Sequence, residues 1–266
     1  MSLVEKPYIG VTGISEISEA DIVARTFSET LLSTSSHVGM VGYLVSHKTL
    51  TGNREGYVKY PQIENLPGLL KVTAPTALNT IHYRTPDKTS LAEQVLRLFD
   101  KGNIYADNLC RVLQLNIAWP NINQLERIRT ELPQLGLILT LTPRILRKES
   151  RFDIEDKLAD YKDIVNYVLI DPSGGIRKVF EAKTVLPLYS SIKDIMRNQI
   201  VVFTGGFNEI NIKPRLIEIA GLIKTKQFGI DAEGGLRESN RDPHAGKLSL
   251  YKTVTYLKNA ASFFDS

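Results

Sequence analysis

Short apolar runs rich in valine, isoleucine, leucine and tyrosine recur along the chain, and each ends in small or polar residues. These runs are continuous rather than strictly alternating, which is typical of parallel strands covered on both faces. Successive runs start about 30 residues apart, the length of one strand–helix unit. We therefore expect eight strands, at Tyr8–Gly13, His37–Val45, Leu78–Arg84, Val112–Ile117, Gly136–Thr142, Asn166–Asp171, Gln199–Thr204 and Phe228–Ala232.

Stretches with the apolar spacing of amphipathic helices lie between the runs. The clearest are Ile17–Leu32, Ser90–Phe99, Asn123–Leu132, Ile212–Ile223 and Leu248–Phe263. Strands that alternate with helices predict a parallel sheet, and eight such units in 266 residues are typical of a (β/α)8 TIM barrel. The rival doubly wound sheet usually has a glycine-rich loop after its first strand, where this chain has only Gly13.

We expect a single barrel domain over residues 1–266, with one elaborated unit. The longest irregular stretch, residues 49–75, follows the second strand and contains Gly52, Gly56, Pro61 and Pro67. We interpret it as a loop-rich insertion. It is either a lid over the site or a surface excursion.

Composition excludes several classes of protein. An apolar fraction of 42% with a net charge of +4 excludes a disordered chain, and the scattered basic residues argue against a nucleic-acid partner. The chain has neither an apolar run of membrane-spanning length nor the pattern of a signal peptide, so we expect no membrane partner and a cytoplasmic protein. Cys110 is the only cysteine, and the histidines are scattered; we therefore expect no metal and no cofactor.

Candidate catalytic and binding residues are those where the strands end, because active sites of this fold lie at the carboxyl ends of the strands. The last two strands end on glycine pairs, Gly205-Gly206 and Gly234-Gly235. Glycines allow backbone N–H groups to approach an anion closely, and these two loops form the usual phosphate site of the fold. Tight turns are the alternative explanation for one pair. Two pairs on adjacent strands favour phosphate binding.

Two further strand ends carry titratable groups. Asp171 closes the sixth strand and is either a general acid or a turn residue before Pro172; the sequence does not choose between these roles. His82 closes the third strand and is either a base or a rim histidine, while Arg84 is suited to a carboxylate or phosphate.

Six motifs, in order along nearly the whole chain, resemble phosphoribosylanthranilate isomerase, a barrel of tryptophan biosynthesis. They are Gly10–Ile14, Val41–Tyr43, Leu113–Asn116, Gly174–Glu181, Thr204–Asn208 and Asp231–Glu238, followed by Gly246-Lys247. The resemblance implies a barrel of the ribulose-phosphate-binding type. It also implies a reaction in which a phosphoribosyl ring is opened and isomerised to a ketose.

The resemblance assigns roles to individual positions. Asp171 stands where the family has its general acid, whereas Thr12 stands where the family has its cysteine base. Asn116 replaces a histidine of the fourth strand, and Lys178 lies in the sixth loop as the family's lysine does. The family's arginine after the second strand is missing at its place, and Arg54 lies close by. The positions that differ from the family lie at the reactive centre, whereas the glycine loops of the phosphate end resemble those of the family.

We therefore expect an isomerase that acts on a phosphorylated sugar derivative. Asp171 is its acid, and Thr12, His82 and Asn116 face the reacting carbon. The alternatives are a non-catalytic barrel that binds a phosphorylated metabolite, and a phosphoribosylanthranilate isomerase with an unusual base. The expected partner is a small phosphorylated molecule. The sequence is compatible with a homodimer and does not determine the oligomeric state.

Overall fold

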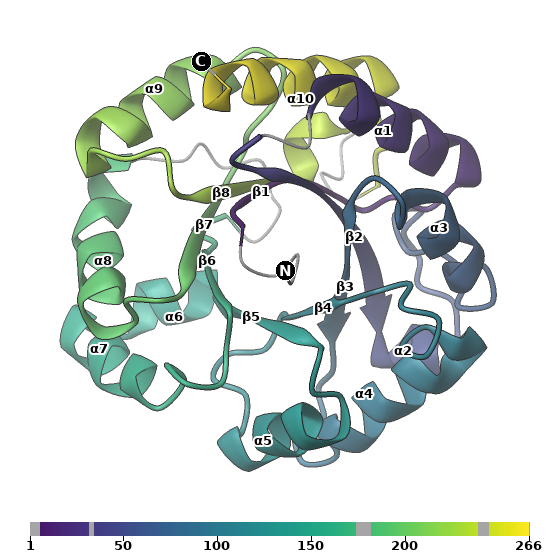
Figure 1. The fold of residues 1–266 in the computed structure, drawn as a ribbon. Coiled ribbons are helices and arrows are strands. Elements are labelled where there is room, and N and C mark those ends of the chain that lie inside the picture. The colour runs from purple at the N-terminus through teal and green to yellow at the C-terminus, as the bar shows by residue number, and fades with distance from the viewer. Residues whose placement is uncertain (1–5, 32–34, 174–181, 239–244, 266) are drawn as a thin grey trace.

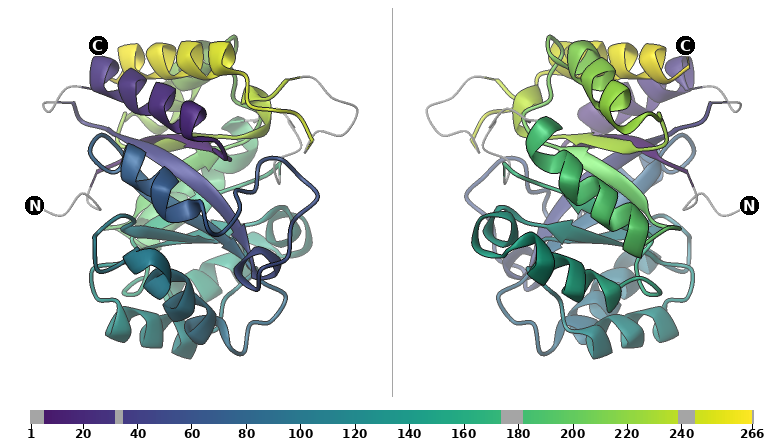
Figure 2. Two further views of the ribbon diagram at one scale, coloured as in Figure 1. Left: turned by 90° about the vertical axis from the view of Figure 1, so that its right-hand side faces the viewer. Right: turned by 90° about the vertical axis from the view of Figure 1, so that its left-hand side faces the viewer.

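A closed barrel of eight parallel strands forms the centre of the protein, surrounded by helices (Figures 1 and 2). The computed structural model describes residues 6–31, 35–173, 182–238 and 245–265, without the side chains of 182–184. Each strand pairs with the next in sequence, and the barrel closes between β1 and β8. The strands are β1 (Tyr8–Thr12), β2 (Val38–Ser46), β3 (Leu78–Arg84), β4 (Val112–Leu115), β5 (Gly136–Leu141), β6 (Tyr167–Ile170), β7 (Ile200–Thr204) and β8 (Gly229–Ala232).

Helices connect the strands on the outside of the barrel (Figure 1). They are α1 (Ile17–Thr30), α2 (His47–Leu50), α3 (Leu66–Thr73), α4 (Leu91–Asp100), α5 (Ile122–Glu131), α6 (Pro143–Lys148), α7 (Arg151–Ala159), α8 (Ala182–Ile195), α9 (Ile212–Ile223) and α10 (Leu250–Phe264). Two short 3₁₀ turns are η2 (Lys101–Asn103) and η3 (Gly234–Leu236).

The predicted (β/α)8 barrel is confirmed, and each of the eight strands is found close to its expected bounds. The helix α3 lies within residues 49–75, the segment that the sequence predicts to be loop-rich. Pro67 stands at the second position of α3, where a proline does not interrupt helical hydrogen bonds, so the proline that suggested a loop belongs to a helix start.

Two apolar layers stabilise the barrel. The larger one lies between strands and helices; for example, the amphipathic α4 buries Leu91, Val95 and Phe99 against it. The smaller layer fills the interior of the barrel, with Tyr8, Met40, Leu78, Val112, Ile138, Tyr167, Leu169 and Val202. Because this apolar layer fills the interior of the barrel, we expect a ligand site at the carboxyl ends of the strands, where active sites of this fold lie.

Candidate functional site

A cavity of about 390 Å³ lies at the carboxyl ends of the strands, and its volume suits a small metabolite. Most of its lining comes from the last residues of the strands and the loops that follow them. The lining residues include Leu44, His82, Arg84, Gln114, Asn116, Thr140, Thr142, Asp171, Ser173, Thr204, Gly206, Asp231, Glu233 and Gly234.

The segment that follows β2 forms one wall of this cavity. Glu55, Tyr57, Lys59 and Tyr60 all line it. The Lys59 ammonium pairs with the Glu233 carboxylate after β8 at 2.5 Å, and Lys59 is only 7% exposed. The segment therefore reaches across the mouth of the barrel to the loop of β8, which agrees with the lid interpretation rather than with a surface excursion.

Three polar side chains from β1, β3 and β8 meet below the cavity: His82 and Asp231 line its floor, and Thr12 lies against Asp231 without lining the cavity. The Thr12 hydroxyl donates to the Asp231 carboxylate, at 2.9 Å to Oδ1 and 3.0 Å to Oδ2. His82 Nε2 lies 3.5 Å from the same hydroxyl. All three residues are buried, and the sequence predicted two of them, Thr12 and His82, as site residues.

Burial moves the two titratable groups of this cluster in opposite directions. It raises the pKa of Asp231 to about 7, and the charges of Glu233 and Asp171 add to that rise, while the hydrogen bond from Thr12 opposes it. Burial lowers the pKa of His82 to about 4, so the imidazole is neutral at pH 7. Asp231 is consequently the group of this cluster that exchanges its proton near neutral pH.

Asp171 lies at the end of β6 and lines the cavity. Its Oδ1 accepts hydrogen bonds from the backbone N–H and the hydroxyl of Ser173, both at 3.0 Å. The turn role that the sequence offered for Asp171 is therefore present. A position on the cavity wall, which the acid role requires, is present as well.

The wall formed by β4 and β5 is polar. Gln114 donates through Nε2 to Asn116 Oδ1 at 3.0 Å, and both residues line the cavity beside Thr140 and Thr142. Within the part of the chain that the structure describes, Gln114 Oε1 and the hydroxyls of Thr140 and Thr142 are buried without a hydrogen-bond partner. Buried polar atoms without a partner are costly, so this wall is suited to the hydroxyl groups of a ligand.

The two glycine pairs contribute one residue each to the cavity lining, Gly206 and Gly234. Gly206 has a φ of 63°, and its carbonyl accepts a hydrogen bond from Asn211 at 2.9 Å. Gly205 is buried and is not among the lining residues. Gly235 lies against the carbonyl group of Phe207, where an added Cβ would overlap the backbone. These glycines therefore bring the loops of β7 and β8 together at one edge of the cavity.

Of the remaining predicted ligand-binding residues, Arg84, Arg54 and Lys178, the structure brings only one to the cavity within the described part of the chain. Arg84 lines the cavity. Arg54 is exposed and lines an adjoining hollow with Glu16 and Asn53 instead. Lys178 lies outside the described residues.

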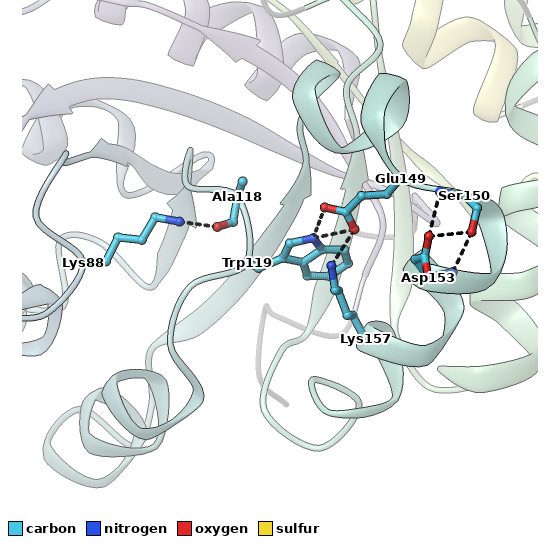
Figure 3. Close-up of polar contacts among 7 residues, drawn as sticks. All are labelled: Lys88, Ala118, Trp119, Glu149, Ser150, Asp153 and Lys157. Atoms are coloured by element: carbon cyan, nitrogen blue, oxygen red, sulfur yellow. Dashed lines mark hydrogen bonds and ion pairs between the residues drawn. The ribbon is translucent and has the colours of Figure 1, made fainter.

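Trp119, which follows β4, contacts residues of the segment between β5 and β6 (Figure 3). Its indole N–H donates to both carboxylate oxygens of Glu149 at 2.9 Å, and its ring packs against Tyr161. Lys157 contacts the same carboxylate at 2.9 Å and lies over the indole (Figure 3). Trp119 is not among the residues that line the cavity, so packing explains it.

Sequence reasoning missed the roles of Asp231, Glu233 and Lys59. Asp231 and Glu233 are visible at a strand end, but their burial and pairing depend on contacts with β1 and with the segment after β2. Lys59 stands in an irregular segment without any local signal. Only the closed barrel brings these residues together.

No three histidine, cysteine or acidic residues are grouped to hold a metal ion within the described ranges. In the same ranges, no helix is both long and apolar enough to cross a membrane.

Comparison with known proteins relates the chain to solved structures alone. No family model matches it, and a search of curated proteins by sequence finds no match. The phosphoribosyl anthranilate isomerase of Thermus thermophilus superposes with a TM-score of 0.62 at 15% identity, covering 96% of this chain and 99% of that one. The Thermotoga maritima enzyme gives 0.60 at 16% identity, covering 97% and 99%.

A third structure is a phosphoribosyl anthranilate isomerase in complex with reduced 1-(o-carboxyphenylamino)-1-deoxyribulose 5-phosphate. It gives a TM-score of 0.59 at 15% identity, covering 96% of this chain and 99% of that one. Identities this low establish a shared fold rather than a shared activity. The chain is a (β/α)8 barrel built like those of the phosphoribosyl anthranilate isomerases.

Proposed function

We propose that this protein is an isomerase that acts on a phosphorylated sugar derivative, with Asp171 as the general acid. The observation that carries the proposal is the cavity itself, which has Asp171 and Asp231 on its wall and floor and the glycine loops of β7 and β8 at one edge. An acid and a base acting on one sugar are the minimum that aldose–ketose isomerisation requires.

The substrate would lie across the cavity. Its phosphate would bind at the loops of Gly206 and Gly234, which line the cavity, as in other barrels of this type. Its hydroxyl groups would meet the polar wall of Gln114 and Thr140. Arg84, at the rim, would bind a carboxylate on the second half of the substrate. Phosphoribosylanthranilate, which has all three features, is the first substrate to test.

The phosphate end is tested by calorimetry with the reduced deoxyribulose phosphate compound and with its dephosphorylated form. We expect the phosphorylated compound to bind at least tenfold more tightly. A Gly206→Glu variant adds a negative charge at the edge of the cavity and should remove that preference. Equal affinity of the wild type for both compounds would argue against a phosphate site.

A non-catalytic barrel that binds a phosphorylated metabolite is the second candidate. It predicts the same binding without product. Because it needs no titrating acid, Asp171→Asn would leave its only activity, binding, unchanged. Formation of product by the wild type but not by Asp171→Asn would exclude this candidate.

A further inference from the structure

We propose that Asp231 is the general base of this site, held for that role by Thr12. The proposal rests on the proposed isomerase function and supplies the group that the resemblance left open. It concerns residues at the floor of the cavity, where β1 has a threonine whose alkyl hydroxyl has no tendency to ionise at neutral pH.

The Asp231 carboxylate lies beside Thr12, whose hydroxyl cannot itself act as a base at neutral pH. The Thr12 hydroxyl donates its hydrogen bond to Asp231, so its O–H group is engaged with the carboxylate. Asp231 lines the cavity and is 5% exposed. The base function therefore passes from β1 to the neighbouring strand, β8, with which it is paired.

Two glycines leave room for this arrangement. Gly10 is opposite Asp231 in the register of β1 and β8, and an added Cβ there would lie 2.8 Å from Asp231 Oδ1. An added Cβ on Gly42 would overlap the Thr12 hydroxyl and lie 2.7 Å from His82 Nε2. The strands thus have no side chain at the two positions that would displace the cluster.

The other titratable groups around Asp231 are less suited to the role. His82 is neutral but has a pKa of about 4, which makes it a weak base. Glu233 is paired with Lys59, and Asp171 accepts hydrogen bonds from Ser173. Burial, aided by the charge of Asp231, keeps the pKa values of Tyr8 and Tyr256 well above their usual range, so both phenols are neutral. A pKa of about 7 lets Asp231 exchange a proton at neutral pH.

The two carboxyl groups act one after the other. Asp171 gives its proton to the ring oxygen, the bond from that oxygen to C1 breaks with its electron pair on oxygen, and the substrate nitrogen forms a double bond to C1. Asp231 then takes the proton from C2. The C–H electron pair forms the second bond of a C1=C2 double bond, and the π pair of the C=N bond returns to nitrogen. The resulting enol becomes a ketone when C1 gains a proton and the C2 hydroxyl loses one.

The test measures kcat and KM for phosphoribosylanthranilate as a function of pH in the wild type, Asp231→Asn, Thr12→Val and Thr12→Ser. Asp160→Asn, at an exposed position after α7, is the control. We expect Asp231→Asn to lose about 10²–10⁴-fold in kcat, the usual contribution of a general base, and to bind the reduced deoxyribulose phosphate compound as the wild type does.

Thr12 is expected to act as a positioning residue. Its hydroxyl stabilises the carboxylate, so in Thr12→Val the acidic limb of the pH–rate profile should move to higher pH, and Thr12→Ser should restore it. If Asp231→Asn keeps kcat within about threefold while the wild type is active, the base assignment is wrong and the isomerase function stands. If the wild type itself makes no product, the proposed function fails, and the base assignment fails with it.

Discussion

Removal of the Asp231 charge should stabilise the protein at alkaline pH. Burial raises the pKa of this carboxyl from 3.8 to about 7, so between these values the folded protein holds a proton that the unfolded chain releases. The free energy of unfolding therefore falls as pH rises from about 4 to about 7 and stays low above that. A shift of about 3 units corresponds to about 4 kcal/mol at 1.36 kcal/mol per unit.

The variant Asp231→Asn keeps the shape of the side chain and cannot ionise. We expect its free energy of unfolding to exceed that of the wild type by an amount that grows by about 3 kcal/mol between pH 5 and pH 8.5, which is the part of the total shift that falls in this range. The measurement is urea unfolding, followed by circular dichroism at both pH values, with Asp160→Asn as the control.

The comparison of variants removes the contributions of other groups. His82, whose pKa is lowered from 6.5 to about 4, gives stability that is lost as pH falls below 6.5, and it does so in both proteins. A difference between Asp231→Asn and the wild type that stays constant within about 0.5 kcal/mol across this range would show that Asp231 is not destabilised by burial. The pKa of Asp231 would then not be raised by burial, and the physical reason for its action as a base at neutral pH would be absent.

Three further perturbations test the environment of the site. In Gly235→Ala, the added Cβ overlaps the Phe207 carbonyl, so we expect a loss of about 1–3 kcal/mol by urea unfolding, whereas Gly56→Ala, with open space around it, should change stability little; equal stability of the two variants would show that the loops of β7 and β8 are not in contact. Lys59→Met leaves the Glu233 carboxylate without its cation, and we expect about 2 kcal/mol of destabilisation, absent when Glu233 is also replaced by glutamine. Cys110 is buried with a pKa raised to about 12, so its thiol should react with a thiol reagent in urea and not in the native protein; rapid native labelling would disprove that burial.

The pattern of apolar runs was sufficient to predict the barrel. A parallel strand buried on both faces must be a continuous apolar run, and eight such runs leave few alternatives. Helices were predicted less well: α3 contains a proline and a glycine, and α8 contains Pro187, so their local signals resemble loops.

The site was predicted only where a residue's position along its strand determines its place. His82, Asn116 and Asp171 lie near strand ends and line the cavity, because a barrel brings all strand ends to one face. Thr12 ends β1 and does not itself line the cavity but contacts Asp231, which does. Lys59 and the pKa of Asp231 depend on contacts between segments far apart in sequence, including a bond across 219 positions from Thr12 to Asp231. Such contacts have no local pattern, and only the folded structure shows them.

The most direct measurement is turnover of phosphoribosylanthranilate, followed by loss of its fluorescence, with the wild type, Asp171→Asn and Asp160→Asn in parallel. We predict that the wild type and Asp160→Asn convert the substrate at equal rates and that Asp171→Asn is slower by at least about 10²-fold, the contribution of a general acid. A wild type without turnover, or an Asp171→Asn protein as fast as the wild type, would show that this cavity does not carry out the proposed isomerisation.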